Sequence, residues 1–119
     1  MIQYLHADGD GVGDRLQLLL LDGDVEQAAA HSAAISQGII EVVEFLRISG
    51  WLVHFYGGDE VFASTFSLVD LPVVEDLRVR FFQRVGCTLS IGLGKTPAGA
   101  LSSLHRAKLK GRDRIERQD

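Results

Sequence analysis

The five residues Tyr56–Glu60, with the sequence Tyr-Gly-Gly-Asp-Glu, constrain this chain more than any other stretch. They separate two runs rich in aromatic and β-branched residues, 51–56 and 61–66. A Gly-Gly-Asp centre between such runs predicts a tight β-hairpin, in which glycine permits positive φ and close approach of a ligand. Two adjacent carboxylates repel each other, so we expect a divalent cation at this tip. The alternative is a solvated turn, where Asp and Gly are common.

Length and composition predict one compact domain over residues 1–119. The chain has 119 residues, 46% of them hydrophobic, which is enough for one core. The single cysteine, Cys87, excludes an internal disulfide and is expected to be a small buried hydrophobe. With no signal-like start and no membrane-length apolar run, we expect a cytoplasmic protein that does not enter the membrane.

Charge is distributed unevenly along the sequence. The net charge of −4 argues against stable nucleic-acid binding. Acidic residues concentrate in the first half, whereas half of the basic residues follow position 105. A carboxylate pole and a basic tail suit a metal-bound phosphate ligand, and a solvated charged tail is the simpler alternative.

The order of predicted elements is strand, two helices, two strands, helix, strand, helix. Asp24 and Thr96 are expected N-caps, and Gly50, Gly86 and Gly111 are expected to end helices. This βααββαβα order predicts an α+β, ferredoxin-like (RRM-like) fold with an antiparallel sheet backed by helices. The expected ranges are strands at 2–7, 51–56, 61–66 and 88–93, helices at 12–21, 24–49, 71–84 and 96–110, and a short edge strand within 112–116.

The predicted topology brings distant carboxylates together. In a ferredoxin-like sheet the strand 61–66 pairs antiparallel with the strand 2–7, so Asp8 lies beside Asp59 and Glu60. Carboxylates that meet at a sheet edge bind divalent cations, and two such ions assist an in-line displacement at phosphorus. Mg²⁺ suits this role because it takes a few carboxylates together with substrate phosphates.

Residues near this edge are candidates for phosphate binding. Gly9, Gly11 and Gly13 leave backbone N–H groups open near a helix start, although the glycine pattern alone is a weak signal. Lys108, on the last predicted helix, is either a point charge for a phosphate or one more solvated lysine.

Three other patterns do not support a function. Gly94-Lys95-Thr96 resembles the end of a P-loop, but Leu89 occupies the position of its first glycine. Asp8-Gly9-Asp10 resembles the start of an EF-hand loop, but apolar residues stand at two of its ligand positions. The four histidines have no metal-ligand spacing, and we expect His6 and His54 to be satisfied within the sheet.

Four short motifs together resemble the signature of GGDEF-type Palm domains over nearly the whole chain. They are Gly57-Gly58-Asp59-Glu60, Ser90-Ile91-Gly92, Arg106-Ala107-Lys108 and Gly111-Arg112. The front motif, residues 8–13, differs from the Asp-x-Asp then Phe-Lys of diguanylate cyclases. Its glycine-rich form is similar to the minimal CRISPR polymerase family, small relatives of the Palm domain in type III CRISPR complexes.

This resemblance implies a nucleotidyltransferase that uses two Mg²⁺ or Mn²⁺ ions and releases pyrophosphate. It would join nucleoside triphosphates, with ATP favoured, into a cyclic di- or oligonucleotide second messenger in anti-phage defence. A homodimer and a separate effector protein that senses the product are the implied partners. Val61 replaces the signature Phe, and the base-reading residues of guanylate-specific relatives have no clear equivalent.

The resemblance also implies a role for each matched residue. Asp8, Asp59 and Glu60 would be the catalytic and metal-binding acids. Residues of the two glycine-rich turns and the helix lysine would contact the nucleotide: Gly9, Asp10, Gly11, Gly13, Gly57, Gly58 and Lys108.

Two further hypotheses remain open from the residues alone. One is a catalytically silent Palm domain that binds a nucleotide as a sensor. The other is a ferredoxin-like interaction module with a solvated acidic tip.

Overall fold

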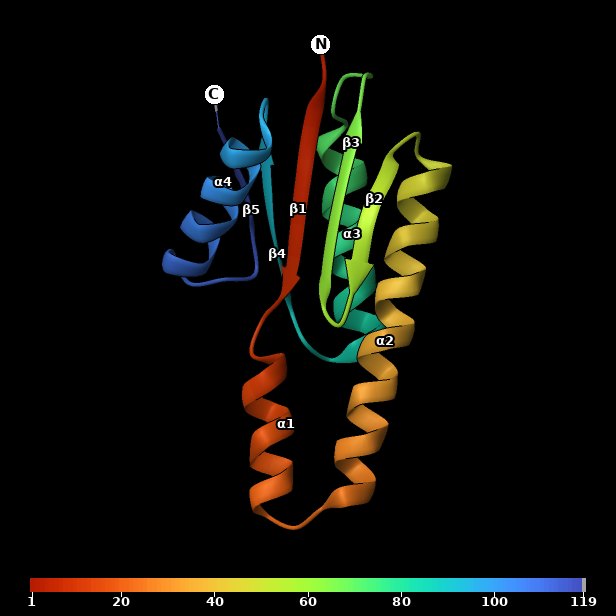
Figure 1. Cartoon of the computed structure of the whole chain (residues 1–119), viewed down its shortest axis with the longest axis vertical. Coiled ribbons are helices and arrows are strands. Elements are labelled where there is room, and N and C mark those ends of the chain that lie inside the picture. Colours follow the sequence, from red (N-terminus) through yellow and green to blue (C-terminus); the bar gives the residue numbers. More distant parts are fainter. Residues whose placement is uncertain (119) are drawn as a thin grey trace.

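The computed structural model describes residues 1–118, and its element order is the predicted one (Figure 1). The expected edge strand is present as β5, so residues 1–118 form five strands and four helices. The bounds are β1 Gln3–Gly9, α1 Val12–Leu21, α2 Val25–Ile48, β2 Leu52–Gly57, β3 Glu60–Thr65, α3 Leu71–Val85, β4 Leu89–Gly94, α4 Pro97–Leu109 and β5 Ile115–Arg117.

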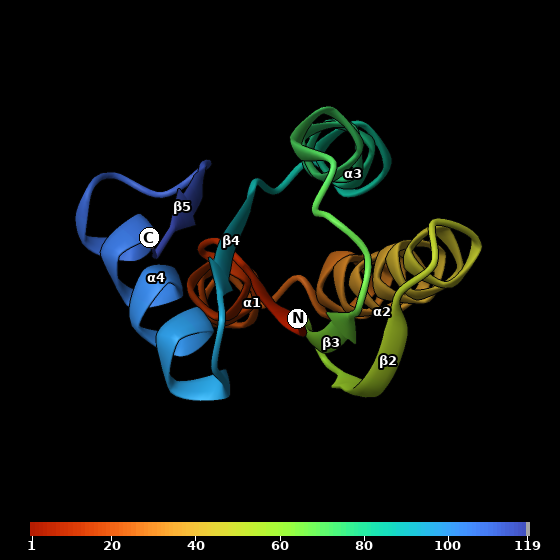
Figure 2. The same ribbon diagram turned by 90° about the horizontal axis from the view of Figure 1, so that it is seen from above.

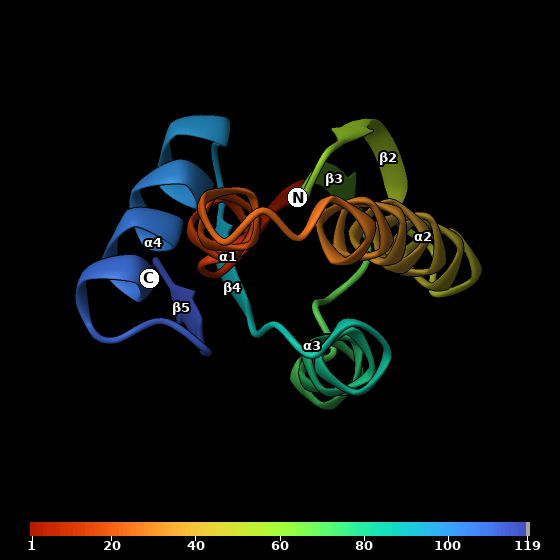
Figure 3. The same cartoon turned by 90° about the horizontal axis from the view of Figure 1, so that it is seen from below.

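The strands form a single sheet in the order β2-β3-β1-β4-β5. All neighbours pair antiparallel except β4 and β5, which are parallel. Helices α2 and α3 cover one face, and α4 lies on the other (Figures 2 and 3). The ferredoxin-like α+β prediction is therefore confirmed, and β1 takes the central position between β3 and β4.

Alternation along the central strands separates the core from the site. Leu5 and Ala7 of β1 are fully buried, and with the alternate residues of β3 and β4 they form the core that packs against α2 and α3. Because successive side chains point to opposite faces, His6 and Asp8 lie on the other face. The chemistry-bearing residues of β1 are thus kept apart from the hydrophobic core.

Helix α1 and the first part of α2 extend beyond the end of the sheet (Figure 1). None of the residues of α1 is buried. The two predicted N-caps are confirmed: Asp24 accepts from the Gln27 N–H at 3.1 Å, and Thr96 accepts from the Gly99 N–H at 2.9 Å. Within residues 1–118, no helix combines the length and the hydropathy that crossing a membrane requires.

Two glycines of β4 let α4 lie directly on the sheet backbone. A Cβ at Gly92 would be 2.2 Å from the Ala100 carbonyl oxygen, and one at Gly94 would be 2.5 Å from the Ala100 nitrogen. Real Cβ atoms do not approach backbone this closely, so only glycine permits the contact. This close packing of α4 on β4 determines where the residues of the last turn of α4 lie relative to β1.

We therefore expect Gly92→Ala to displace α4 and to lower the free energy of unfolding by about 3 kcal/mol, the scale of an overpacked core. Urea denaturation of the purified variant measures the change. Gly13→Ala is the matched control, because a Cβ at this helical position meets no atom within 4 Å. Equal stability of the two variants would contradict the close packing of α4.

Candidate active site

The predicted acidic edge exists at the end of β1 and the start of β3. Asp8 pairs across the ladder with Glu60, and the Gly9 N–H donates to the Asp59 carbonyl at 2.9 Å. Gly9 lies directly against Asp59, since a Cβ there would be 3.1 Å from the Cβ of Asp59. The chain thus needs glycine after Asp8 to let the hairpin turn approach.

Asp59 carries the electrostatic strain of this edge. Burial raises the pKa of Asp59 to about 6, and the negative charge of Asp8 adds to the rise. Two carboxylates that oppose each other's ionisation are stabilised by a cation, and oxygen ligands suit Mg²⁺ or Mn²⁺. The Asp8–Asp59 pair therefore fits one divalent metal ion on its own chemistry.

Glu60 is engaged elsewhere. Its Oε1 lies 2.5 Å from Nε2 of His6, which is buried on the same face of β1. Within residues 1–118 no three His, Cys, Asp or Glu side chains are gathered closely enough to hold a metal. A role for Glu60 as third ligand stays a prediction, and it requires the side chain to leave His6.

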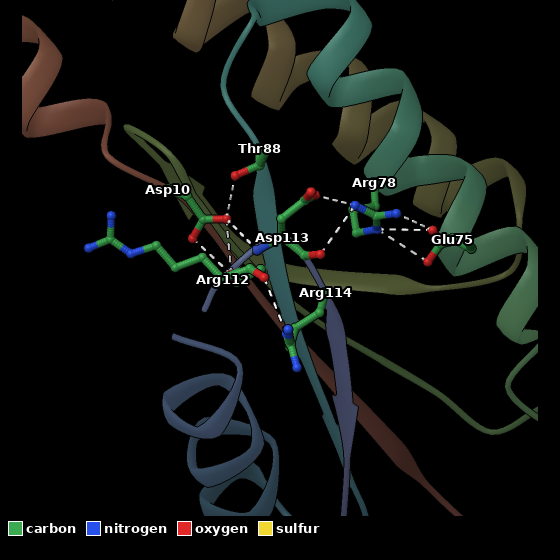
Figure 4. A network of polar contacts seen from close by, with 8 residues as sticks. Asp10, Glu75, Arg78, Thr88, Arg112, Asp113 and Arg114 are labelled. Atoms are coloured by element: carbon green, nitrogen blue, oxygen red, sulfur yellow. Dashed lines mark hydrogen bonds and ion pairs between the residues drawn. The ribbon is translucent and has the colours of Figure 1, made fainter. Parts of the chain in front are cut away.

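Asp10 lies inside a hydrogen-bond network that the sequence did not reveal (Figure 4). Its carboxylate accepts from Ser90 Oγ at 2.8 Å, from Thr88 Oγ1 at 2.8 Å and from the Asp113 N–H at 3.1 Å. Burial alone would raise the pKa of Asp10, but the hydrogen bonds from Lys108, Ser90, Thr88 and Asp113 together lower it. We expected Asp10 to contact the nucleotide; that contact stays a prediction, and its observed partners are structural.

Lys108 is wedged into the acidic edge rather than solvated. Its ammonium donates to Asp10 Oδ1 at 2.7 Å and to the Gly9 carbonyl at 2.9 Å, and it lies 3.1 Å from Asp8 Oδ2. The side chain is 24% exposed, so one side remains open to a ligand. Lys108, one of the predicted phosphate contacts, thus lies within ion-pair distance of both Asp8 and Asp10.

The glycine turns leave open backbone around the edge. Gly11 takes the left-handed conformation, with φ of 68°, and no side chain caps α1 there. Gly58 also has positive φ, and neither Gly57 nor Gly58 has an atom within 4 Å of its Cβ position. The first N–H groups of α1 and the hairpin turn are both accessible to an anion.

Arg112 is a further candidate that residue-by-residue reasoning missed, although its motif was noted. Arg112 and Asp113 both have positive φ. Asp113 is held by its N–H bond to Asp10 and by an ion pair with Arg78. The guanidinium of Arg112 points away from this network (Figure 4), and its Nη1 lies 3.9 Å from the Cβ position of Gly11. A basic group therefore stands beside the start of α1.

The fold is that of the Palm and GGDEF domains. The GGDEF domain of DgcB from Caulobacter crescentus, solved with c-di-GMP, is 17% identical with a TM-score of 0.69, covering 98% of this chain and 77% of that one. The active GGEEF domain of a diguanylate cyclase from Vibrio cholerae is 15% identical with a TM-score of 0.67, covering 99% and 83%.

A Csm1–Csm4 cassette solved with cA3 is 24% identical with a TM-score of 0.73, covering 96% of this chain. The chain spans only 20% of that much longer one. Among curated proteins nothing matches. The sequence-family model of the minimal CRISPR polymerase domain, however, matches residues 4–118 of this chain. The chain belongs to the minimal CRISPR polymerase family.

The raised pKa of Asp59 predicts the pH dependence of stability without metal. The pKa of about 6 in the folded protein exceeds the usual carboxyl value of 3.8, so the stability contributed by protonated Asp59 is present at low pH and is lost as pH rises through about 6. We expect Asp59→Asn to raise the free energy of unfolding by about 1–2 kcal/mol near neutral pH, after solvent screening, and by little at low pH. Chemical denaturation in EDTA at several pH values measures this; the exposed Asp14→Asn should show no such rise.

The Lys108–Asp10 pair predicts a second stability effect. Lys108→Met leaves a buried carboxylate without its cation, which we expect to cost about 3–5 kcal/mol in urea denaturation. Adding Asp10→Asn should recover part of the loss, since the unpaired charge is then removed. Lys95→Met, at an exposed lysine, is the control. If Lys108→Met lost no more stability than Lys95→Met, the result would contradict the network.

Proposed function

We propose that this protein is a metal-dependent nucleotidyltransferase that joins nucleoside triphosphates into a cyclic nucleotide. The observation that carries the proposal is the Asp8–Asp59 pair, in which burial and then the negative charge of Asp8 raise the pKa of Asp59 to about 6. A pair of carboxylates with such a raised pKa is typical of functional sites, and here it could bind a cation that in turn binds a phosphate. The Lys108 ammonium beside it supplies a point charge for the same ligand.

In this proposal Asp8 and Asp59 hold Mg²⁺ or Mn²⁺, with Glu60 as a candidate for a second ion. When bound, the metal would polarise the phosphate and lower the pKa of the attacking ribose hydroxyl. The chain itself would position the two carboxylates: the hydrogen bond from the Gly9 N–H to the Asp59 carbonyl holds the end of β1 beside the hairpin turn. Because this geometry exists before substrate binds, little rearrangement is needed.

The triphosphate would lie between the start of α1 and the end of α4. The N–H groups that follow Gly11 have no side-chain cap and lie at the positive end of the dipole of helix α1. Lys108 and Arg112 flank this position with two positive charges. The open backbone at Gly57 and Gly58 leaves room for the sugar and phosphates beside the acids.

Ring closure requires each nucleotide's hydroxyl to reach the other's α-phosphate. Two sites that face each other across a homodimer achieve this, so we propose a dimer as the active form. We also propose ATP as substrate, a separate effector that senses the product, and a role in anti-phage defence; what supports these is the resemblance to the minimal CRISPR polymerase family.

The decisive test incubates the protein with each nucleoside triphosphate and Mg²⁺, with pyrophosphate release and mass spectrometry of the products as readouts. We expect cyclic product from at least one triphosphate. Asp8→Asn and Asp59→Asn should each lower the rate by at least about a hundredfold, because each removes a charge that acts on the reacting phosphate. Asp14→Asn, an exposed acid of α1, should retain activity. Full activity in Asp59→Asn would overturn the assignment.

One observation favours a second candidate, a nucleotide sensor without turnover. Lys108 Nζ already lies 3.1 Å from Asp8 Oδ2, so part of the negative charge of the edge is neutralised without a metal. A sensor would bind triphosphate and raise the melting temperature without releasing pyrophosphate. Thermal shift and product assay on the same sample separate the two candidates.

A further inference from the structure

Five aromatic side chains gather on the sheet face that α4 leaves uncovered: Tyr4, His6, His54, Phe55 and Phe62, which we call the aromatic platform. Phe62 stacks on Tyr4 with ring centroids 5.8 Å apart and planes at 16°, and on Phe55 at 5.3 Å and 18°. His6 and His54 lie against the same Phe62 ring at 5.3 and 5.7 Å. The rings form one continuous surface over β1, β3 and β2.

This platform does not belong to the core. The core lies on the opposite face, where Leu5 and Ala7 pack toward α2 and α3. Helix α4 packs on β4, β1 and β5, away from β2 (Figure 2). Phe55 keeps 50% of its surface exposed. Apolar rings on a solvent-facing sheet surface call for a ligand or a partner.

An irregularity in β2 builds the platform. The register shifts between Val53 and Phe55, so both His54 and Phe55 meet Phe62 on β3. Bulges commonly redirect a side chain near a functional site. The imidazole of His54 is held by Ser64 Oγ at 2.7 Å, which fixes its ring beside Phe62.

The platform is continuous with the acidic edge. Tyr4, His6 and Asp8 alternate along β1 and so share one face, with His6 about 7 Å from Asp8 at the usual strand rise. His6 bonds Glu60, the residue paired with Asp8. In a nucleotide, the ribose separates the base from the α-phosphate. A phosphate at Asp8 would therefore place the base near His6, the platform ring next to Asp8 on the same face of β1.

We propose that the aromatic platform stacks the nucleobase of a nucleotide held at the Asp8–Asp59 edge; this rests on the proposed function. Phe62 is already stacked between Tyr4 and Phe55, so the half-exposed ring of Phe55 is the one that offers a free face. Every base has a π-face, so stacking on Phe55 binds bases with little discrimination. A second copy of the chain is the competing occupant, and the sedimentation experiment below tests for it. The Nε2 atoms of His6 and His54 are already hydrogen-bonded, to Glu60 and Ser64, which fixes both rings beside Phe62.

The test uses Phe55, the most exposed phenylalanine of the platform. In steady-state pyrophosphate assays with ATP, Phe55→Ala and Phe55→Leu should each raise KM roughly tenfold, since both remove the π-face and Leu retains apolar volume. Phe55→Trp should keep KM near the wild-type value. Phe82→Ala on α3 is the matched control, because Phe82 is also 50% exposed and lies outside the platform. An unchanged KM in Phe55→Leu, which keeps the fold even where the alanine variant does not, would overturn the proposal.

A binding experiment separates this proposal from the catalytic one. The tryptophan fluorescence of Phe55→Trp should be quenched by ATP and by adenosine monophosphate, and not by inorganic tripolyphosphate, which has no base. Equal quenching by tripolyphosphate would overturn the platform. Base-dependent quenching without pyrophosphate release would retain the platform and reject the nucleotidyltransferase. Sedimentation of Phe55→Leu completes the test: conversion of a dimer to a monomer would show a subunit contact instead and also overturn the proposal.

Discussion

The buried contact between Lys108 and Asp10 is the interaction on which the acidic edge depends. The Asp10 carboxylate, 4% exposed, receives donors from β4, from α4 and from the segment that precedes β5. Three consecutive elements, all about 80 to 100 residues from Asp10 in the sequence, therefore meet at its charge. A buried ion pair contributes little net stability, because desolvation offsets its attraction, but it is costly to break. Its effect here is geometric: it sets the position of Lys108 relative to Asp8.

The position of Lys108 also explains how the Asp8–Asp59 pair exists without metal. The ammonium lowers the pKa of Asp59, but burial and Asp8 outweigh it, and the net result is a pKa of about 6. The edge is thus only partly neutralised. In the proposed function an incoming cation would complete this neutralisation, which would let Lys108 turn toward the phosphates. The glycines of β4 make this arrangement feasible because they bring α4 within reach of β1.

Local patterns in the sequence predicted the elements and the topology, which in turn predicted that Asp8, Asp59 and Glu60 share an edge. Hairpin, caps and helix ends depend on neighbours a few residues away, so they can be derived from short motifs. The burial of Asp10 could not, because its partners lie 78 to 103 residues away and are common polar residues. The engagement of Glu60 with His6 and the irregularity in β2 depend on exact strand register, which alternation leaves undetermined.

Glu60 connects the two parts of the surface. It is the first residue of β3, it pairs with Asp8 in the ladder, and its carboxylate bonds the His6 ring of the aromatic platform. A ligand that occupied both the acidic edge and the platform would pass over this residue. If Glu60 turned toward a metal, His6 would lose its partner and its ring nitrogen would become available to the ligand. If both proposals hold, the His6–Glu60 contact would couple base binding to metal binding through a single side chain, and neither site would be independent of the other.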